Sequence, residues 1–317
     1  MAVAELLGRT RGLTCAPEEV LITAGTTHGM TLALQHLWAP GATVAIEDPG
    51  YRAAAAAAER CGWTVWDAPV DDRGFRVDRL GVAPTSTRAY YVTASHQHPL
   101  GGLLPVPRRL ELLTEATRRD AVVFEDDYDS EFRYDVAPLP ALAQLDPARV
   151  IYLGTVAKTL GAGMRLGWLV APAQLIADLA ERRRRVHDHP PWPLQRALLC
   201  LLRDGEWDRV VRQAKRRYRH RATQVQERLG AYGRLLGLEA GMHATLLLPT
   251  KVAAAVAADA AAAGVDVPLL AGHARSAEVQ AGPYASGLVI GYARVSDADL
   301  HRGLGVLESS LARRTAN

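Results

Sequence analysis

The stretch YLGTVAKTLGAGMRLGW, residues 152–168, sets the expectation for the whole chain. It places a lone lysine, Lys158, among glycines and small aliphatic residues directly after an apolar strand, and Arg165 follows seven positions later. A lysine in a dry pocket, or one near other cations, has a lowered pKa and becomes a usable nucleophile toward carbonyl groups. Many lysines after strands are simply exposed, so the role of Lys158 has to be judged from the other motifs.

The chain has 317 residues, 49% of them hydrophobic, which predicts a large buried core and two subdomains. Its formal net charge of +3 argues against a dedicated nucleic-acid binder. The three cysteines lie far apart, as in proteins that keep their thiols reduced. The sequence suits neither a signal peptide nor a membrane span, because charged residues close the alanine run 53–58. We therefore expect a soluble, cytoplasmic α/β protein without a membrane partner.

Short β-branched runs alternate with helical patterns along the first half of the chain. This alternation predicts strands joined by helical crossovers in a mainly parallel sheet. The expected strands are 19–23, 43–48, 64–70, 89–95, 121–127, 150–155 and 167–172. A tight turn and helix over 25–37, the alanine-rich helix and a helix over 107–119 lie between them.

The second half of the chain has a different texture, with two long arginine-rich helical patterns over 173–188 and 205–230. A smaller unit follows, with strands over 243–249 and 287–295 and a helix over 253–264. A last helix opens at Ser296, with Asp299 three residues on, in the manner of a capping box. We expect a large domain over 1–175, connecting helices over 176–230 and a small C-terminal α/β domain over 231–317.

The turn TAGTTHG places Gly25, Thr26 and Thr27 between a strand and a helix. Free N–H groups and the helix dipole favour an anion there, and the threonine hydroxyls add donors. A plain helix N-cap is an equally good interpretation of this turn.

The segment VVFEDDYDSEF, residues 122–132, gathers carboxylates and Tyr128 at the end of an apolar strand. Open α/β sheets bind their ligands at the carboxyl ends of strands. A calcium loop is excluded, because the sixth position lacks glycine and the twelfth lacks glutamate. A solvated acidic turn is the alternative.

These motifs together supply a phosphate cradle, a lysine for a Schiff base, an acid for a pyridine nitrogen and a tyrosine beside it. Pyridoxal 5'-phosphate is the cofactor whose phosphate, aldehyde and pyridine nitrogen match these groups. The pairs HQH (96–98) and HDH (187–189) lack a cysteine or carboxylate partner at ligand spacing, so we expect no metal site. The arginine runs lack a recognisable DNA-binding motif and read as solvated or interface charge, so we expect no nucleic-acid partner for this chain alone.

The motifs ITAGTTHGMTLAL, AIEDPGY, VTASHQHPLG, EDDYDSEFRYD and VIYLGTVAKTLGAGMRLGWLVAP follow one another in a familiar order. In this the chain resembles the aminotransferase-like domain of MocR/GntR-type regulators, over about residues 5 to 310. The resemblance implies the fold of class I/II aminotransferases (fold-type I), with a mainly parallel seven-stranded sheet between helices and a small C-terminal domain. It also implies a homodimer, because the family's sites lie at a subunit boundary.

The resemblance implies a role for each matching residue. Lys158 would form the Schiff base, Asp126 would pair with the pyridine nitrogen, and Tyr128 would lie near the phenolic oxygen; these are the expected catalytic residues. Tyr51 matches the aromatic residue that stacks on the ring, and His98 matches a position beside it. The positions that match phosphate-binding residues are Gly25, Thr26, Thr27, Thr155 and Arg165.

Some positions depart from the family pattern. Ala157 replaces the serine that usually precedes the lysine, and Leu100 replaces a threonine. No arginine stands where aminotransferases grip the substrate carboxylate, and Arg275 and Arg294 are only nearby candidates. We also expect neither the regulators' winged-helix domain nor the N-terminal arm that covers the active site.

We therefore expect a pyridoxal-phosphate-dependent aminotransferase-like protein that acts on or senses a small amino acid or amine through a Lys158 Schiff base. In the enzymatic hypothesis, freed Lys158 moves a proton and Asp126 stabilises the charge on the ring. The alternative is the effector-binding domain of a MocR-type regulator without its DNA-binding domain, which forms an external aldimine without turnover. Release of a keto acid distinguishes the first hypothesis from the second.

Overall fold

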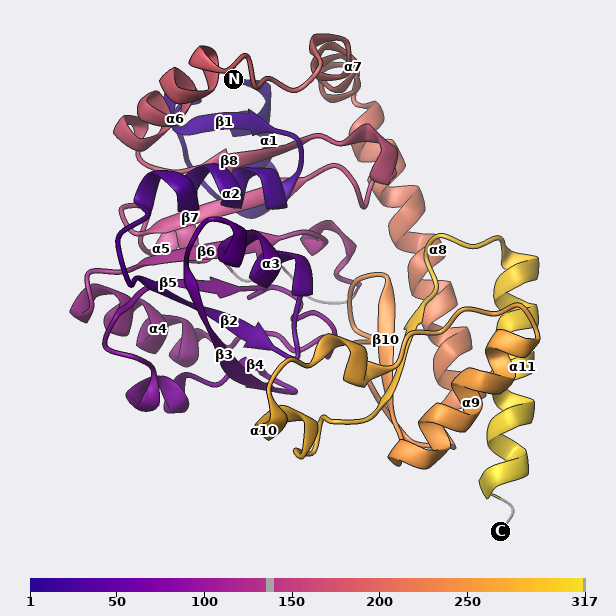
Figure 1. Ribbon diagram of the computed structural model, residues 1–317. Coiled ribbons are helices and arrows are strands. Elements are labelled where there is room, and N and C mark those ends of the chain that lie inside the picture. Colours follow the sequence, from indigo (N-terminus) through magenta and orange to yellow (C-terminus); the bar gives the residue numbers. More distant parts are fainter. Residues whose placement is uncertain (135–139, 316–317) are drawn as a thin grey trace.

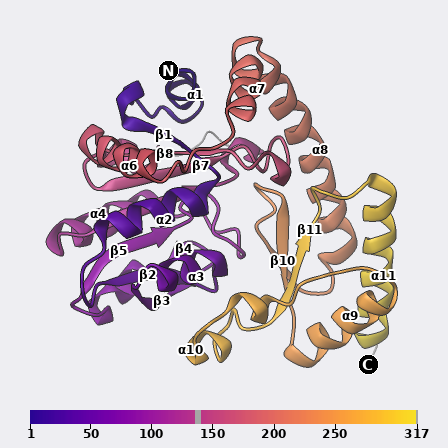
Figure 2. The same ribbon diagram turned by 45° about the horizontal axis from the view of Figure 1, so that its top comes forward.

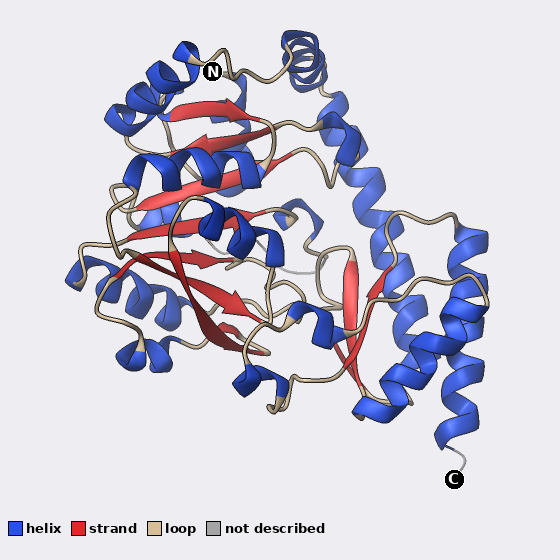
Figure 3. Ribbon diagram, in the orientation of Figure 1, coloured by secondary structure: helices blue, strands red, loops and turns tan. Residues whose placement is uncertain are grey.

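An eight-stranded sheet forms the centre of the larger part of the molecule (Figures 1 and 3). The computed structural model describes residues 1–134 and 140–315; the last residue of the motif EDDYDSEFRYD and the last two residues of the chain lie outside these ranges. The strands are β1 (Val20–Thr23), β2 (Thr43–Asp48), β3 (Thr64–Asp71), β4 (Gly74–Phe75), β5 (Thr87–Val92), β6 (Val122–Asp127), β7 (Val150–Thr155) and β8 (Gly167–Val170).

The sheet has the order β1-β8-β7-β6-β5-β2-β3-β4. The five strands from β7 to β3 are parallel, and β8 runs antiparallel between β7 and β1. All seven strands expected from the sequence are present, so the prediction of a mainly parallel sheet is confirmed. The structure adds β4, which pairs antiparallel with β3 through Val70 and Phe75.

Helices cover both faces of this sheet because successive residues of each buried strand point to opposite sides. One apolar cluster packs the sheet against α2 (Thr26–Leu37), α3 (Arg52–Arg60) and α6 (Ala173–Arg185). The other packs it against α1 (Ala2–Arg11), α4 (Val106–Arg118) and α5 (Leu142–Leu145). The alanine run expected to be a packed helix lies in α3, where Ala54, Ala55 and Ala58 are buried.

The second part of the molecule lies beside the first and is built around a three-stranded antiparallel sheet of order β11-β10-β9 (Figures 1 and 2). Its elements are α8 (Glu206–Leu229), β9 (Arg234–Leu236), β10 (His243–Leu247), α9 (Thr250–Ala262), α10 (Ala277–Gln280), β11 (Gly287–Gly291) and α11 (Asp297–Thr315). The preceding α7 (Trp192–Arg203) packs against α8, and 3-10 turns form at Pro17–Glu19, Val77–Val82, Ser130–Phe132, Ala162–Met164 and Leu270–His273.

Two side-chain arrangements in this part follow from the sequence. The backbone N–H of Asp299 donates to Ser296 Oγ over 3.1 Å, which confirms the predicted cap of the last helix. Helix α8 joins the two parts, because Trp207 belongs to the core of the large sheet and Tyr218 to the core of the small one. The domain boundaries near residues 175 and 230 stay a prediction.

The arginine runs are less solvated than the sequence indicates. Arg183 on α6 is buried and donates to the carbonyls of Asp188 and Ile22. Arg221 on α8 is also buried and pairs with Asp297 at 2.6 Å. These two guanidinium groups hold elements together. Across the described ranges, no helix combines the length and apolarity needed to cross a bilayer.

Candidate active site

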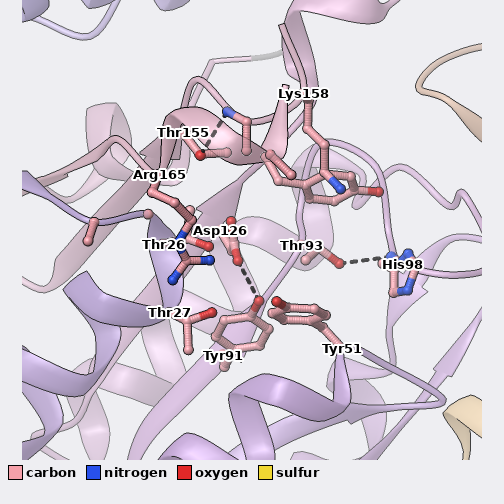
Figure 4. A pocket seen from close by; sticks show the side chains of 15 residues that line it. Thr26, Thr27, Tyr51, Tyr91, Thr93, His98, Asp126, Thr155, Lys158 and Arg165 are labelled. Carbon is pink, nitrogen blue, oxygen red and sulfur yellow. Dashed lines mark hydrogen bonds between the residues drawn. The ribbon is translucent and has the colours of Figure 1, made fainter. Parts of the chain in front are cut away.

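A pocket of about 240 Å³ lies at the carboxyl ends of the parallel strands (Figure 4). It collects residues that follow β2, β5, β6 and β7 and the first turn of α2. All ten residues singled out in the sequence line it, namely Gly25, Thr26, Thr27, Tyr51, His98, Asp126, Tyr128, Thr155, Lys158 and Arg165. The chain therefore brings together in one place five segments that are far apart in sequence.

Lys158 follows β7 and points into the pocket from its rim (Figure 4). Its ammonium nitrogen Nζ lies 5.6 Å from the centre of the Tyr128 ring. In the single chain Lys158 is one of the exposed residues of its loop. Thr155 anchors that loop, since its hydroxyl accepts from the N–H of Ala157 and donates to the carbonyl of Leu166, each over 3.1 Å.

Asp126 forms the buried floor of the pocket. The Tyr91 hydroxyl donates to its Oδ2 atom over 2.6 Å, and its Oδ1 atom has no hydrogen-bond partner among the described residues. Burial raises the pKa of Asp126 to about 6, while the hydrogen bond from Tyr91, the nearby hydroxyl of Thr26 and the charge of Lys158 oppose that rise. A buried, unpaired carboxylate oxygen requires a donor, and this one faces a pocket.

Three other carboxylates of the motif EDDYDSEF are buried as well and Glu131 is half-buried, so the alternative of a solvated acidic turn is wrong. Glu125, Asp127 and Asp129 are each at most 4% exposed. Asp127 pairs with Arg11 at 2.6 Å on the far face of the sheet. The alternation of β6 therefore turns Asp126 alone of its strand carboxylates toward the pocket.

Another side of the pocket, apart from Asp126, is formed by a helix N-terminus and a guanidinium group. Gly25 caps α2 with a φ of 97°, a conformation that favours glycine, and Thr26 and Thr27 begin the helix. Arg165 adopts a left-handed conformation with φ 43°, and within 1–134 and 140–315 no carboxylate pairs with it. Free N–H groups, hydroxyls and an unpaired arginine form a suitable site for a phosphate.

Comparison with known proteins identifies the family. The family model described as "Aminotransferase class I and II" matches residues 1–277. The chain belongs to this family.

The aminotransferase-family chain has relatives of two kinds. It is 41% identical to the HTH-type transcriptional regulator TauR of Rhodobacter capsulatus over 67% of its own length and 43% of that protein. It is 36% identical to the probable rhizopine catabolism regulatory protein MocR of Rhizobium meliloti, over 69% and 44%. Against the 2-aminoadipate transaminase of Thermus thermophilus the identity is 33%, over 65% and 53%. The chain thus spans about half the length of these curated relatives.

Solved structures confirm the fold. An archaeal alanine:glyoxylate aminotransferase superposes with a TM-score of 0.88 at 24% identity, over 98% of this chain and 79% of that one. The α-aminoadipate aminotransferase LysN of Thermus thermophilus, solved with N-(5'-phosphopyridoxyl)-L-leucine, gives 0.82 at 26% identity, over 99% and 82%. The fold is that of the fold-type I aminotransferases.

In this aminotransferase-family chain, Tyr128 is held by residues that the sequence did not connect. Its hydroxyl donates to the carbonyl of His96 over 3.0 Å and lies 3.1 Å from His96 Nδ1, which is 2.8 Å from Asp129 Oδ2. Burial, and then Asp129, raise the pKa of Tyr128 well above its usual value, so the phenol stays protonated. In the sequence, no carboxylate stands at ligand spacing from the histidines of HQH. The fold nevertheless brings Asp129 and His243 beside His96, and the potential metal-ligand atoms of these three residues lie within 4.8 Å of one another.

His98 lines the side of the pocket opposite Arg165 (Figure 4). The backbone N–H of His98 donates to Thr93 Oγ1, and the Thr93 hydroxyl donates to the buried Glu47 over 2.5 Å. Burial lowers the pKa of His98 to about 3, helped by His273 and Lys158, so its imidazole is neutral at ordinary pH.

Two further observations complete the site of this family member. Neither candidate for a carboxylate-binding arginine lines the pocket: Arg275 pairs with Asp67 and Glu59, and Arg294 is exposed. Tyr91 and Thr93 do line the pocket, although the sequence analysis missed them. Their position at the end of the strand AYYVTAS, beside the acidic strand end, is the signal that could have indicated them.

Proposed function

We propose that this chain binds pyridoxal 5'-phosphate through Lys158 and acts on or senses a small amino acid or amine. The observation that carries the proposal is the composition of one pocket. It contains a buried unpaired carboxylate oxygen on Asp126, the amine of Lys158 and the guanidinium of Arg165 beside a helix N-terminus. A cofactor with an aldehyde, a protonated ring nitrogen and a phosphate meets each of these three groups.

The donor set fits such a cofactor residue by residue. Arg165, Thr155 and the first turn of α2 would hold the phosphate, and the Tyr51 ring at the rim would cover a ring face. Asp126 Oδ1 would accept a hydrogen bond from a protonated pyridine nitrogen. Ala157 removes one hydroxyl donor that the family usually has next to the lysine, yet the remaining donors suffice for a dianion.

In this proposal, three residues of the chain, Asp126, Lys158 and Tyr128, act on the cofactor and its ligand. When bound, pyridoxal phosphate supplies an aldehyde that condenses with amines and a ring that withdraws electrons. Asp126 holds a proton at the ring nitrogen, which requires the carboxylate to be ionised. Lys158 would take a proton from the ligand's Cα and return it as a general acid–base. Tyr128, whose hydroxyl donates to the carbonyl of His96, forms the wall of the pocket beside Lys158.

The test of cofactor binding is the visible spectrum of the purified protein. We expect the protein to be coloured, or to become so when pyridoxal phosphate is added, and Lys158→Ala to lack that band. We expect an added amino acid or amine to change the band, and a transamination reaction to release a keto acid. A protein that stays colourless with the cofactor would contradict the proposal.

A second candidate function, sensing without turnover, is favoured by two observations. Neither Arg275 nor Arg294 lines the pocket, and two of the relatives above are regulators. In this case an amine changes the spectrum and no keto acid or other product accumulates over hours. The same assay therefore distinguishes an aminotransferase from the effector-binding domain of a MocR-type regulator.

We also propose a homodimer. Tyr51, Lys158 and Arg165 are all exposed at the pocket rim of the single chain, as expected of a site that a second subunit completes. The alternative, a monomer with a solvent-filled pocket, would leave Lys158 exposed to water.

A further inference from the structure

One hydrogen bond on the pocket floor joins two strands of the large sheet through Tyr91 and Asp126. Tyr91 near the end of β5 and Asp126 near the end of the adjacent β6 point to the same face of the sheet, because Tyr91 pairs with Phe124, two residues before Asp126. The Tyr91 hydroxyl donates to Asp126 Oδ2 over 2.6 Å, as the dashed line in Figure 4 shows. Both side chains are buried, at 1% and 4% exposure.

This bond divides the two oxygens of Asp126 between two tasks. Oδ2 is bound to the phenol, which leaves Oδ1 as the oxygen without a partner among the described residues. Carboxylates rotate easily about their last bond, so a single strong donor on one oxygen fixes the direction of the other. Tyr91 stays a donor over the whole working range of pH, because burial and then Asp126 raise its pKa well above the usual value.

We propose that Tyr91 is a positioning residue for Asp126: its hydroxyl keeps the carboxylate ionised and directs Oδ1 to the cofactor's ring nitrogen. The inference rests on the proposed function, because it concerns how the same site binds its cofactor. It is carried by the geometry of the hydrogen bond, the burial of both groups and the unpaired Oδ1.

The electrostatic surroundings show why Asp126 needs such a donor. Burial and the neighbouring Asp127 on β6 favour the protonated acid. Glu47 near the end of β2 is a second buried carboxyl, and burial, with a further contribution from the charge of Asp126, raises its own pKa to about 7. The groups that favour the ionised form are the hydroxyls of Tyr91 and of Thr26 on α2 and the ammonium of Lys158 after β7. Of these three groups, Tyr91 is the one whose hydroxyl donates directly to an oxygen of the carboxylate, over 2.6 Å.

The test compares Tyr91→Phe with the wild-type chain. Pyridoxamine 5'-phosphate is the probe, because its amine cannot condense with Lys158 and its affinity reports non-covalent contacts alone. Its Kd is measured by calorimetry from pH 5.5 to 8.5, and the ratio of variant to wild-type Kd cancels the titration of the probe itself. Loss of the donor raises the pKa of Asp126, so the variant loses its carboxylate at a higher pH than the wild type does.

We expect the Kd ratio to approach about tenfold at pH 5.5 and to fall toward one at pH 8.5, for a pKa rise of about one unit. Tyr90→Phe is the matched control. It removes a buried hydroxyl from the residue that precedes Tyr91 in β5, and that hydroxyl lies on the other face of the sheet. Its ratio should stay near one at every pH. Thermal unfolding of both variants checks that each is folded.

A Tyr91→Phe ratio that is constant across pH, whether near one or large, would overturn the inference, because a merely structural role of Tyr91 changes affinity equally at all pH values. Failure of the proposed function has a different signature. In that case the wild-type chain binds neither pyridoxamine phosphate nor pyridoxal phosphate at any pH. The two outcomes are distinguished within the same set of titrations.

Discussion

At the scale of single residues, the site depends on a few side chains whose neighbours set their chemistry. Asp126 is useful because burial isolates one of its oxygens, and Arg165 because no carboxylate of the described chain neutralises it. The motifs around Lys158 and Asp126 could be identified from the sequence, since each is contiguous. The hydrogen bonds of Tyr91 to Asp126 and of His96 to Asp129 could not, because each joins residues more than 30 positions apart.

Arg165 offers a direct test of the phosphate side. Arg165→Lys keeps the charge and loses the planar pair of donors, so we expect Kd for pyridoxal phosphate to rise about tenfold. Kd for pyridoxal, which lacks the phosphate, should not change. The control is Arg60→Lys, at an exposed position of α3. An equal loss for both ligands would show that Arg165 does not bind the phosphate.

Gly241 tests the packing behind Tyr128. It has φ 76°, and a Cβ there would lie 2.2 Å from His96 Cε1 and 2.6 Å from Asp129 Oδ2. Gly264 has a similar φ of 72° with nothing within 4 Å, so Gly264→Ala measures the backbone cost alone. We expect Gly241→Ala to lower the free energy of unfolding by about 2 kcal/mol more than Gly264→Ala does, in urea titrations. Equal losses would mean that the His96–Asp129 pair can move aside.

At the scale of elements, the sequence predicted the long periodic segments well and the short or irregular ones poorly. All nine expected strands and the helices α2, α3, α4, α6, α8, α9 and α11 are present. β4 was missed because two residues carry no alternation, and α7 because Pro193 and Trp192 at its start read as a loop. The sequence analysis did not predict α1, which packs Val3, Leu6 and Leu7 into the core and pairs its last residue, Arg11, with Asp127 at 2.6 Å.

The anchoring of α1 is therefore a prediction about an element. Arg11→Ala leaves Asp127 as a buried charge, so we expect the free energy of unfolding to fall by about 3–5 kcal/mol. Arg9, on the same helix, pairs with Asp208 at the exposed surface, so Arg9→Ala should cost less than about 1 kcal/mol. Chemical denaturation of the two variants checks this. Similar small losses would show that water or another group replaces Arg11.

At the scale of the whole molecule, a second part lies beside the large sheet. One of its segments, which contains His273 and Arg275, contacts the pocket side of that sheet. The N–H of Gly50 donates to the carbonyl of His273, and Arg275 donates to Asp67 over 2.8 Å. This segment crosses from the small sheet to the end of β2, next to Tyr51. No periodic pattern in the sequence could have predicted this contact, because it depends on a loop meeting a strand end more than 200 residues away.

The proposed homodimer is tested at this scale. One chain has a mass of 34.2 kDa, so light scattering should report about twice that mass for the purified protein. We also expect Lys158 to be less accessible to amine-reactive reagents in the dimer than Lys251, which is exposed. A 34.2 kDa particle with a freely reactive Lys158 would contradict the dimer.

The central claim is that one particular amine holds the cofactor, and the chain is well suited to a direct measurement because it has three lysines, Lys158, Lys215 and Lys251. The protein is mixed with pyridoxal phosphate and reduced with borohydride, and its peptides are analysed by mass spectrometry. The account predicts a phosphopyridoxyl group on Lys158 in stoichiometric amount and at most traces on the other two. Equal labelling of all three lysines, or none on Lys158, would contradict it.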